Sequence, residues 1–139
     1  MTKFASEVRN ALVEIDRRRA EQVAREREAR ETASRKLAAR RNAVRQLTVA
    51  YKEVFTGAAA ASQDRLEVQI LSSPVGSDCR LRWSARDEGI MAVLDSDAGT
   101  ITWHRISEET HQSTDEDPLT ASKERAQERV LEFVRKGPP

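Results

Sequence analysis

The sequence predicts an α+β fold: a long, coiled-coil-like amino-terminal helix, a small four-stranded antiparallel sheet, and a carboxy-terminal helix packed on that sheet. Three observations favour this order. Neither glycine nor proline occurs in the first 56 residues, apolar residues alternate with polar ones after residue 64, and a helical apolar stripe follows Pro118. We therefore divide the chain into a charged helix over 1–57, a linker or helix extension over 58–64, and a small ββββα domain over 65–137.

The first segment has the composition of one continuous helix. Alanine, arginine and glutamate dominate it, and all three are strong helix formers. Thr2 can cap the start of the helix, and Gly57 stands where a left-handed residue would end it. We therefore expect a helix over 3–56, on the order of 80 Å long.

Apolar residues cluster at both ends of this helix. The rear set follows a 7-3-4-3 spacing, which is typical of a coiled-coil seam, and the front set cannot join its register without a stutter. We predict that both sets bind a partner, the rear set by pairing with a second helix. The front residues are Phe4, Val8, Leu12 and Ile15, and the rear residues are Leu37, Val44, Leu47, Tyr51 and Val54.

The middle of the helix is highly charged. Residues 16–41 contain ten lysines and arginines and five acidic residues. An acid four residues before a base supports a helix by about 0.3–0.5 kcal/mol, so we interpret this stretch as a self-supporting, solvated spacer. Three such pairs occur in it: Glu21–Arg25, Glu26–Arg30 and Glu31–Arg35.

Sequence-independent binding of nucleic acid by the same helix is the alternative. The net charge over 1–56 is +6, although that of the whole chain is only +1. Basic side chains contact phosphates without reading sequence, but the interleaved acids weaken their field. The candidate phosphate contacts are Arg17, Arg18, Arg19, Arg40, Arg41 and Arg45.

Four short segments with alternating apolar and polar residues follow the linker. Turn sequences rich in glycine, aspartate and serine separate them, and their close spacing predicts an antiparallel meander. We interpret the acidic stretch 108–117 as a loop. The predicted strands are 65–72, 79–86, 89–95 and 100–107.

A final helix is predicted to begin at Asp117, with Pro118 at its first position, and to end at Gly137. It should cover the sheet face that carries Trp83 and Trp103. The resulting core is thin for about 75 residues, so we expect support from the rear of the long helix or from a second copy. A homodimer is therefore favoured. The apolar stripe of this helix consists of Leu119, Ala126, Val130, Phe133 and Val134.

One loop resembles two known functional loops. VLDSDAGT (93–100) is similar to the nucleophile loop of haloacid-dehalogenase-type phosphatases and to a calcium-binding loop. Gly99 stands where the phosphatase loop has threonine, and Ile106 stands where the calcium loop has glutamate. We interpret 95–100 as a hairpin turn.

The remaining reactive side chains predict no active site. The chain has two histidines, His104 and His111, and one cysteine, Cys79. A zinc site needs three or four ligands in one place, so these residues alone do not predict one. No nucleotide-binding glycine motif or nucleophile-elbow motif is present. Arg80, Arg82 and Arg86 share one strand face, which we interpret as solvated or ion-paired. We expect no metal, no cofactor and no enzymatic activity.

The predicted function is that of a non-enzymatic, self-associating interaction module, or scaffold, which oligomerises through its long helix. Its partner would be a second copy or another protein. A single cysteine excludes an intramolecular disulfide. The sequence has neither a signal peptide nor about 18 consecutive apolar residues, so we expect a cytoplasmic protein that does not bind membranes.

Overall fold

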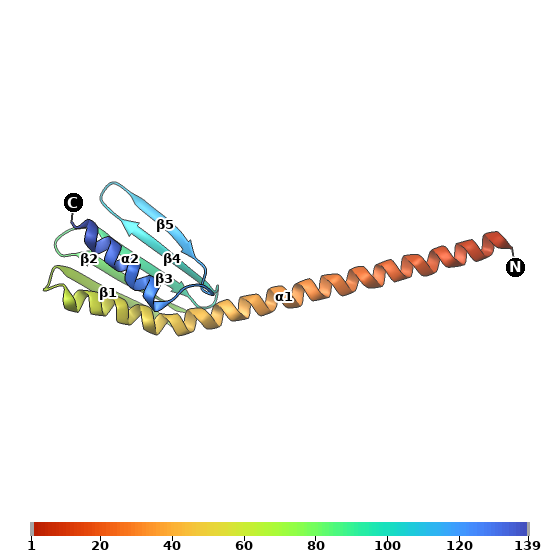
Figure 1. The fold of residues 1–139 in the computed structure, drawn as a ribbon, viewed down its shortest axis with the longest axis horizontal. Helices are drawn as coiled ribbons and strands as arrows, with labels where there is room; N and C mark the ends of the chain where they lie inside the picture. The colour runs from red at the N-terminus through yellow and green to blue at the C-terminus, as the bar shows by residue number, and fades with distance from the viewer. Residues whose placement is uncertain (1, 139) are drawn as a thin grey trace. The chain divides into compact units, whose positions relative to one another are not determined.

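A computed structural model describes residues 2–138 and confirms the α+β class. A long helix, α1 (Lys3–Ala61), precedes a five-stranded antiparallel sheet and a final helix, α2 (Lys123–Lys136) (Figure 1). The chain divides into two compact units at the boundary between Lys36 and Leu37. The second unit therefore contains the last 25 residues of α1 together with the sheet and α2.

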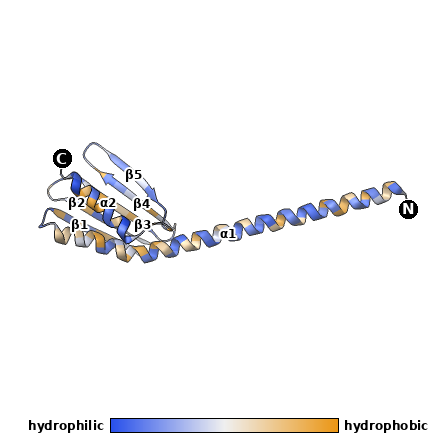
Figure 2. Ribbon diagram, in the orientation of Figure 1, coloured by the Kyte–Doolittle hydropathy of each residue, from blue (hydrophilic) through white to orange (hydrophobic). Residues whose placement is uncertain are grey.

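The first unit consists of the amino-terminal part of α1. The predicted cap is confirmed, because the Thr2 hydroxyl accepts a hydrogen bond from the Ala5 amide at 3.2 Å. Figure 2 shows mainly hydrophilic colouring along this part of the helix, interrupted by a few orange positions. The hydrophilic surface is what a solvated helix requires.

The end of α1 lies beyond the predicted end. Gly57 is helical, and four alanines carry the helix on to Ala61 because alanine is the best helix former. The left-handed residues that follow are Gln63 and Asp64, with φ of 55° and 65°. Ser62 steadies this turn, since its hydroxyl donates to the Ala59 carbonyl at 2.7 Å. The segment 58–64, predicted to be a linker or a helix extension, thus extends the helix over its first four residues.

The sheet is a meander in which each strand pairs with the next. Its second strand starts and ends three residues earlier than predicted. It starts at Gly76, which pairs with Ser73 of the preceding strand. It ends at Trp83, because Ala85 has φ of 63° and the Trp83 amide closes the next hairpin by donating to the Glu88 carbonyl. The strands are β1 (Leu66–Ser73), β2 (Gly76–Trp83), β3 (Gly89–Asp95), β4 (Thr100–Ile106) and β5 (His111–Glu116).

The fifth strand occupies the stretch that was predicted to be a loop. β5 pairs with β4 from Ile106–His111 to Ile101–Glu116, and a hydrogen bond from the Ser107 amide to the Thr110 carbonyl closes the hairpin. None of its six residues is aliphatic, so the strand carries no apolar alternation. A strand of this composition is tolerated because it lies at the edge of the sheet.

The final helix begins later than Asp117-Pro118. The Asp117 carboxylate accepts from the Leu119 amide at 3.0 Å and forms a turn instead of a helix cap. Ser122 is the true cap, since its hydroxyl accepts from the Arg125 amide at 3.2 Å. Leu119 consequently lies outside the helix and is exposed, whereas the rest of the predicted stripe faces the core.

The core lies on the sheet face that carries both tryptophans, as predicted. Trp103 contacts Tyr51 and Phe55 of α1, with ring centroids 5.6 and 5.8 Å apart. Trp83 packs on Phe133 of α2 at 5.8 Å. The support that the thin core needs therefore comes from the rear of the same chain's α1 as well as from α2.

Candidate interaction surfaces

An apolar stripe near the start of α1 is the most exposed hydrophobic feature of the first unit. We call Phe4, Val8, Leu12 and Ile15 the amino-terminal stripe. Their spacing places them within an arc of about 100° on one side of the helix. Phe4 is 73% exposed and Leu12 56% exposed. Val13 lies on the opposite side of the helix and is exposed to a similar degree.

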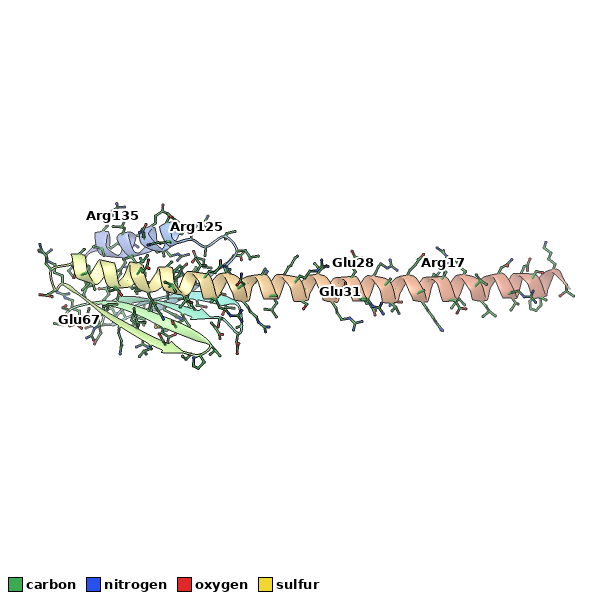
Figure 3. All side chains as sticks on the ribbon, turned by 90° about the horizontal axis from the view of Figure 1, so that it is seen from below. Arg17, Glu28, Glu31, Glu67, Arg125 and Arg135 are labelled. Atoms are coloured by element: carbon green, nitrogen blue, oxygen red, sulfur yellow. The ribbon has the colours of Figure 1, made fainter. Side chains whose placement is uncertain are left out.

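Ion pairs support the helix just after the stripe. Arg17 donates to the Glu14 carboxylate and, at 2.9 Å, to the Glu21 carboxylate. The hydrogen bond from Arg17, and a smaller effect of one from Arg18, keep the pKa of the Glu14 carboxyl below its ordinary value. Figure 3 shows the Arg17 side chain standing outward from the ribbon. The contacts therefore stabilise a solvated helix and create no buried site.

The predicted acid-first pairs differ in detail from the observed contacts. Glu21 pairs with Arg17, which precedes it, and not with Arg25. Arg30 and Arg35 reach back four residues as expected, but each donates to a backbone carbonyl, at 3.4 Å, and not to a carboxylate. The expected consequence, a helix stabilised by its own charged side chains, follows from either set of contacts.

The rear set of apolar residues is largely covered within its own unit. Val44, Tyr51 and Val54 are buried in the core, Leu47 packs against it, and Leu37 is half-buried. The sheet and α2 occupy the seam that the sequence predicted for a partner helix. The coiled-coil spacing is thus satisfied by packing against the chain's own sheet, since a helix presents the same stripe to either partner.

A buried polar cluster joins α1, the sheet and α2. The Glu116 carboxylate accepts from the Tyr51 hydroxyl at 2.5 Å and from Trp103 Nε1 at 3.1 Å. Arg129 Nε lies 3.7 Å from the other carboxylate oxygen, and its guanidinium lies over the Trp103 ring. Burial, followed by the contact with Glu116, raises the pKa of the Tyr51 hydroxyl. This cluster satisfies a buried carboxylate and ties three elements together.

Sequence reasoning missed this cluster because Glu116 stood in a presumed loop. The signal that could have revealed the cluster is the alternation of side chains along β5. It places Gln112, Thr114 and Glu116 on the sheet face that carries the tryptophans. A carboxylate on that face requires donors from the elements that cover it. The sequence pattern placed Tyr51, one of these donors, in a contact with a second helix instead.

The arginines proposed for nucleic acid are divided between the two units and differ in their contacts. Arg17 and Arg18 are engaged with Glu14, whereas Arg19 makes no ion pair with any residue in 2–138. In the second unit, Arg41 Nε donates to the Asp97 carbonyl at 2.6 Å and so fixes a hairpin. Arg40 and Arg45 are exposed on the same part of α1.

The loop that resembles phosphatase and calcium loops is a hairpin turn. The Asp95 carboxylate accepts from the amides of Asp97 and Ala98, at 3.0 Å each, so it caps its own turn. Gly99 has φ of 68°, and a Cβ there would lie 3.1 Å from the Arg40 Cβ. The glycine thus allows both the turn and the close approach of α1.

The outer face of the sheet carries the predicted basic residues. Arg82 pairs with Glu67 of β1 at 2.6 Å, and Arg80 Nε contacts the Met91 sulfur at 3.1 Å. Arg86 lies beyond the end of β2, in the following turn. His104, with His111 of β5, also lies on this face. It is a mixed and partly ion-paired surface.

The remaining candidates lie inside or beside the core. Cys79 is fully buried, and burial raises the pKa of its thiol to about 11. No three histidine, cysteine or acidic side chains gather into a metal site among the described residues. A mainly apolar cavity of about 930 Å³ lies between the ends of α1 and α2 and is lined by Leu66, Trp83 and Val134, among others. Trp83 Nε1 is buried and has no hydrogen-bond partner within 2–138.

Comparison with known proteins gives no assignment: no protein family, curated protein or solved structure shows significant similarity to the chain. Neither helix of residues 2–138 has the apolar stretch needed to cross a bilayer.

Proposed function

We propose that this protein is a non-enzymatic scaffold module that self-associates through its long helix, as a cytoplasmic homodimer, with the amino-terminal stripe as the contact surface. The observation that carries the proposal is the exposure of four large apolar side chains on one side of a helix that is rich in charged residues. Contiguous apolar patches on a helix are typical of partner-binding surfaces.

The rear of α1 has a smaller part in the proposal than the sequence suggested. Its buried residues support the sheet, so a partner helix could reach them only by displacing that core. Leu37, which is half-buried, is the first residue of the second unit. The contact between copies is therefore assigned to the front of the helix.

The stripe supports a weak association. Burying an exposed aliphatic or aromatic side chain contributes roughly 1.5–3 kcal/mol, and these side chains are about half exposed. Two stripes of four residues would thus contribute on the order of 8–10 kcal/mol. Lost translational and rotational freedom costs about 4–15 kcal/mol, so at most about 6 kcal/mol remains, and we expect dissociation constants of roughly tens of micromolar or weaker.

The test is the solution mass of the full chain across a wide concentration range, by light scattering at low and high salt. We expect the mass to rise towards a dimer with concentration and to keep that dependence at high salt, because apolar contacts are not screened. Leu12→Glu should remain monomeric. Val13→Glu is the matched control: it adds the same charge, one residue away, on the opposite side of the helix.

Two results would overturn the proposal. A wild-type chain that stays monomeric at hundreds of micromolar excludes self-association of functional strength. A dimer that tolerates Leu12→Glu as well as Val13→Glu places the contact elsewhere. Circular dichroism of both variants checks that helix content is unchanged.

Nucleic-acid binding is the second candidate, favoured by Arg19, Arg40 and Arg45, which are exposed and make no ion pair with residues in 2–138. An electrophoretic shift with duplex DNA that weakens steeply as salt rises would support it. Replacing Arg19, Arg40 and Arg45 with glutamate should then weaken the shift strongly, and replacing Arg17, Arg18 and Arg19 should weaken it to a smaller extent. Absence of binding at low salt would eliminate this candidate.

A further inference from the structure

The only two histidines of the chain meet on the outer face of the sheet. His104 pairs with Ser113 across β4 and β5, and His111 pairs with Ile106, so the two rings are diagonal neighbours on one face. His104 Nδ1 lies 3.0 Å from His111 Nε2, and the ring centroids are 5.1 Å apart. The strands, which are antiparallel and joined by a short hairpin, hold both rings in register.

This separation matches two ligands on one metal ion. Imidazole nitrogens bind transition metals at about 2.0–2.1 Å, so two of them lie about 2.9 Å apart at a right angle and about 3.4 Å apart at the tetrahedral angle. The observed 3.0 Å is close to the right-angled value. Right-angled pairs of nitrogen ligands are found in the tetragonal sites of Cu²⁺ and in the square-planar or octahedral sites of Ni²⁺.

The two rings can supply both lone pairs without a net release of protons. In the free protein, one of the two facing nitrogens carries a proton and donates a hydrogen bond to the other. Coordination requires both facing nitrogens to be unprotonated, so His104 would carry its proton on Nε2 and His111 on Nδ1. Ser113 Oγ, 2.9 Å from His104 Nδ1, would give up its present hydrogen bond. Water would fill the other coordination positions.

The surroundings are compatible with a cation. The segment 108–117, which contains His111, has five acidic residues and neither lysine nor arginine. Arg80 is the nearest base in the same cross-strand row, separated from His104 by Met91. Its guanidinium is directed at the Met91 sulfur, at 3.1 Å. Both imidazoles are accessible to an ion from solvent because His104 is half-buried and His111 exposed.

We propose that His104 and His111 form a two-histidine site for a divalent transition metal, Cu²⁺ or Ni²⁺, which clips the edge strand β5 to β4. The proposal is independent of self-association, because the site uses neither the amino-terminal stripe nor another copy. It does not depend on a third protein ligand. The affinity is accordingly expected to be below that of structural sites with three or four protein ligands.

The test is calorimetric titration of the full chain, carrying no affinity tag, with Ni²⁺ alone. We expect one ion per chain, and a melting temperature that rises in the presence of Ni²⁺ because the ion binds only the folded arrangement. His104→Ala and His111→Ala should each abolish both effects. Ser113→Ala is the control: it removes the neighbouring hydroxyl, keeps both imidazoles and should retain binding.

Each other outcome overturns the site. Absence of Ni²⁺ binding by the wild-type chain excludes it. Binding that survives either histidine substitution shows that other groups hold the ion. A ratio of one ion to two chains shows that each chain supplies only part of a site, and a melting temperature that rises equally in His111→Ala excludes the clip between β4 and β5.

Discussion

The two tryptophans allow the contribution of the buried Glu116 cluster to be measured by a matched pair of substitutions. Trp83 and Trp103 lie on the same sheet face and are both buried. Trp103 Nε1 donates to Glu116, whereas Trp83 Nε1 has no partner within 2–138. Trp83→Phe and Trp103→Phe remove the same atoms, so the difference between them compares a hydrogen-bonded indole N–H with an unpaired one.

The expected difference follows from two opposite effects. A hydrogen bond to a charged group contributes about 1.5–3 kcal/mol, and Trp103→Phe loses it. A buried, unpaired donor costs about 1–3 kcal/mol, and Trp83→Phe relieves that cost. Both variants also lose packing. We therefore expect Trp103→Phe to reduce the free energy of unfolding by about 2.5–6 kcal/mol more than Trp83→Phe.

Urea denaturation supplies the measurement. Each variant retains one tryptophan in the second unit, so fluorescence reports the unfolding of that unit, and circular dichroism provides a second probe. The free energies should be compared at unchanged m-value, because a changed slope would indicate a different denatured state. Equal losses for the two variants, within about 0.5 kcal/mol, would refute the assigned role of Glu116.

Three further outcomes are expected. Gly57→Ala should stabilise the helix by about 0.5–1 kcal/mol, because Gly57 is helical with open space around it. Gly99→Ala should destabilise the second unit, because Gly99 has a positive φ and a Cβ there would press on Arg40. Thermal unfolding of the two variants should show opposite shifts in melting temperature. Cys79 should react with a thiol reagent at pH 8 only when urea unfolds the protein, and fast labelling of the native chain would contradict its burial. The free energy of unfolding should fall as pH rises from about 8.5 to about 11, because the pKa of the thiol is higher in the folded than in the unfolded chain. Val44→Glu should unfold the second unit, at a cost of about 3–5 kcal/mol, since it buries an unpaired carboxylate; a native near-ultraviolet dichroism spectrum would contradict this.

The structural features that depend on local patterns could be predicted from the sequence. The cap at Thr2, the run of helix formers after it and the alternation around Trp83 and Trp103 are each encoded within a few residues. The face covered by the final helix also followed, because alternation fixes which side chains share a side of a strand. These features need no knowledge of distant contacts.

The features that sequence did not predict depend on contacts between distant segments. β5 has no apolar alternation and is held by its pairing with β4, and Glu116 is stable inside only because Tyr51 and Trp103 lie opposite it. A periodic apolar stripe likewise does not specify its partner, so the rear of α1 looked like a coiled coil. Gly57 shows the limit of single-residue signals, since the alanines after it continue the helix.

The continuity of α1 across the boundary between Lys36 and Leu37 links the helicity of the first unit to the folding of the second. Starting a helix is unfavourable because several dihedral angles are fixed for one hydrogen bond, whereas extending an existing helix is nearly free. The buried turns around Val44 and Tyr51 act as the nucleus, and the charged turns propagate from it towards Thr2. A peptide of residues 1–36 alone should accordingly be less helical than the same segment in the intact chain. The folded unit thus presents the apolar side chains in a preformed helix, which lowers the ordering entropy lost when they bind.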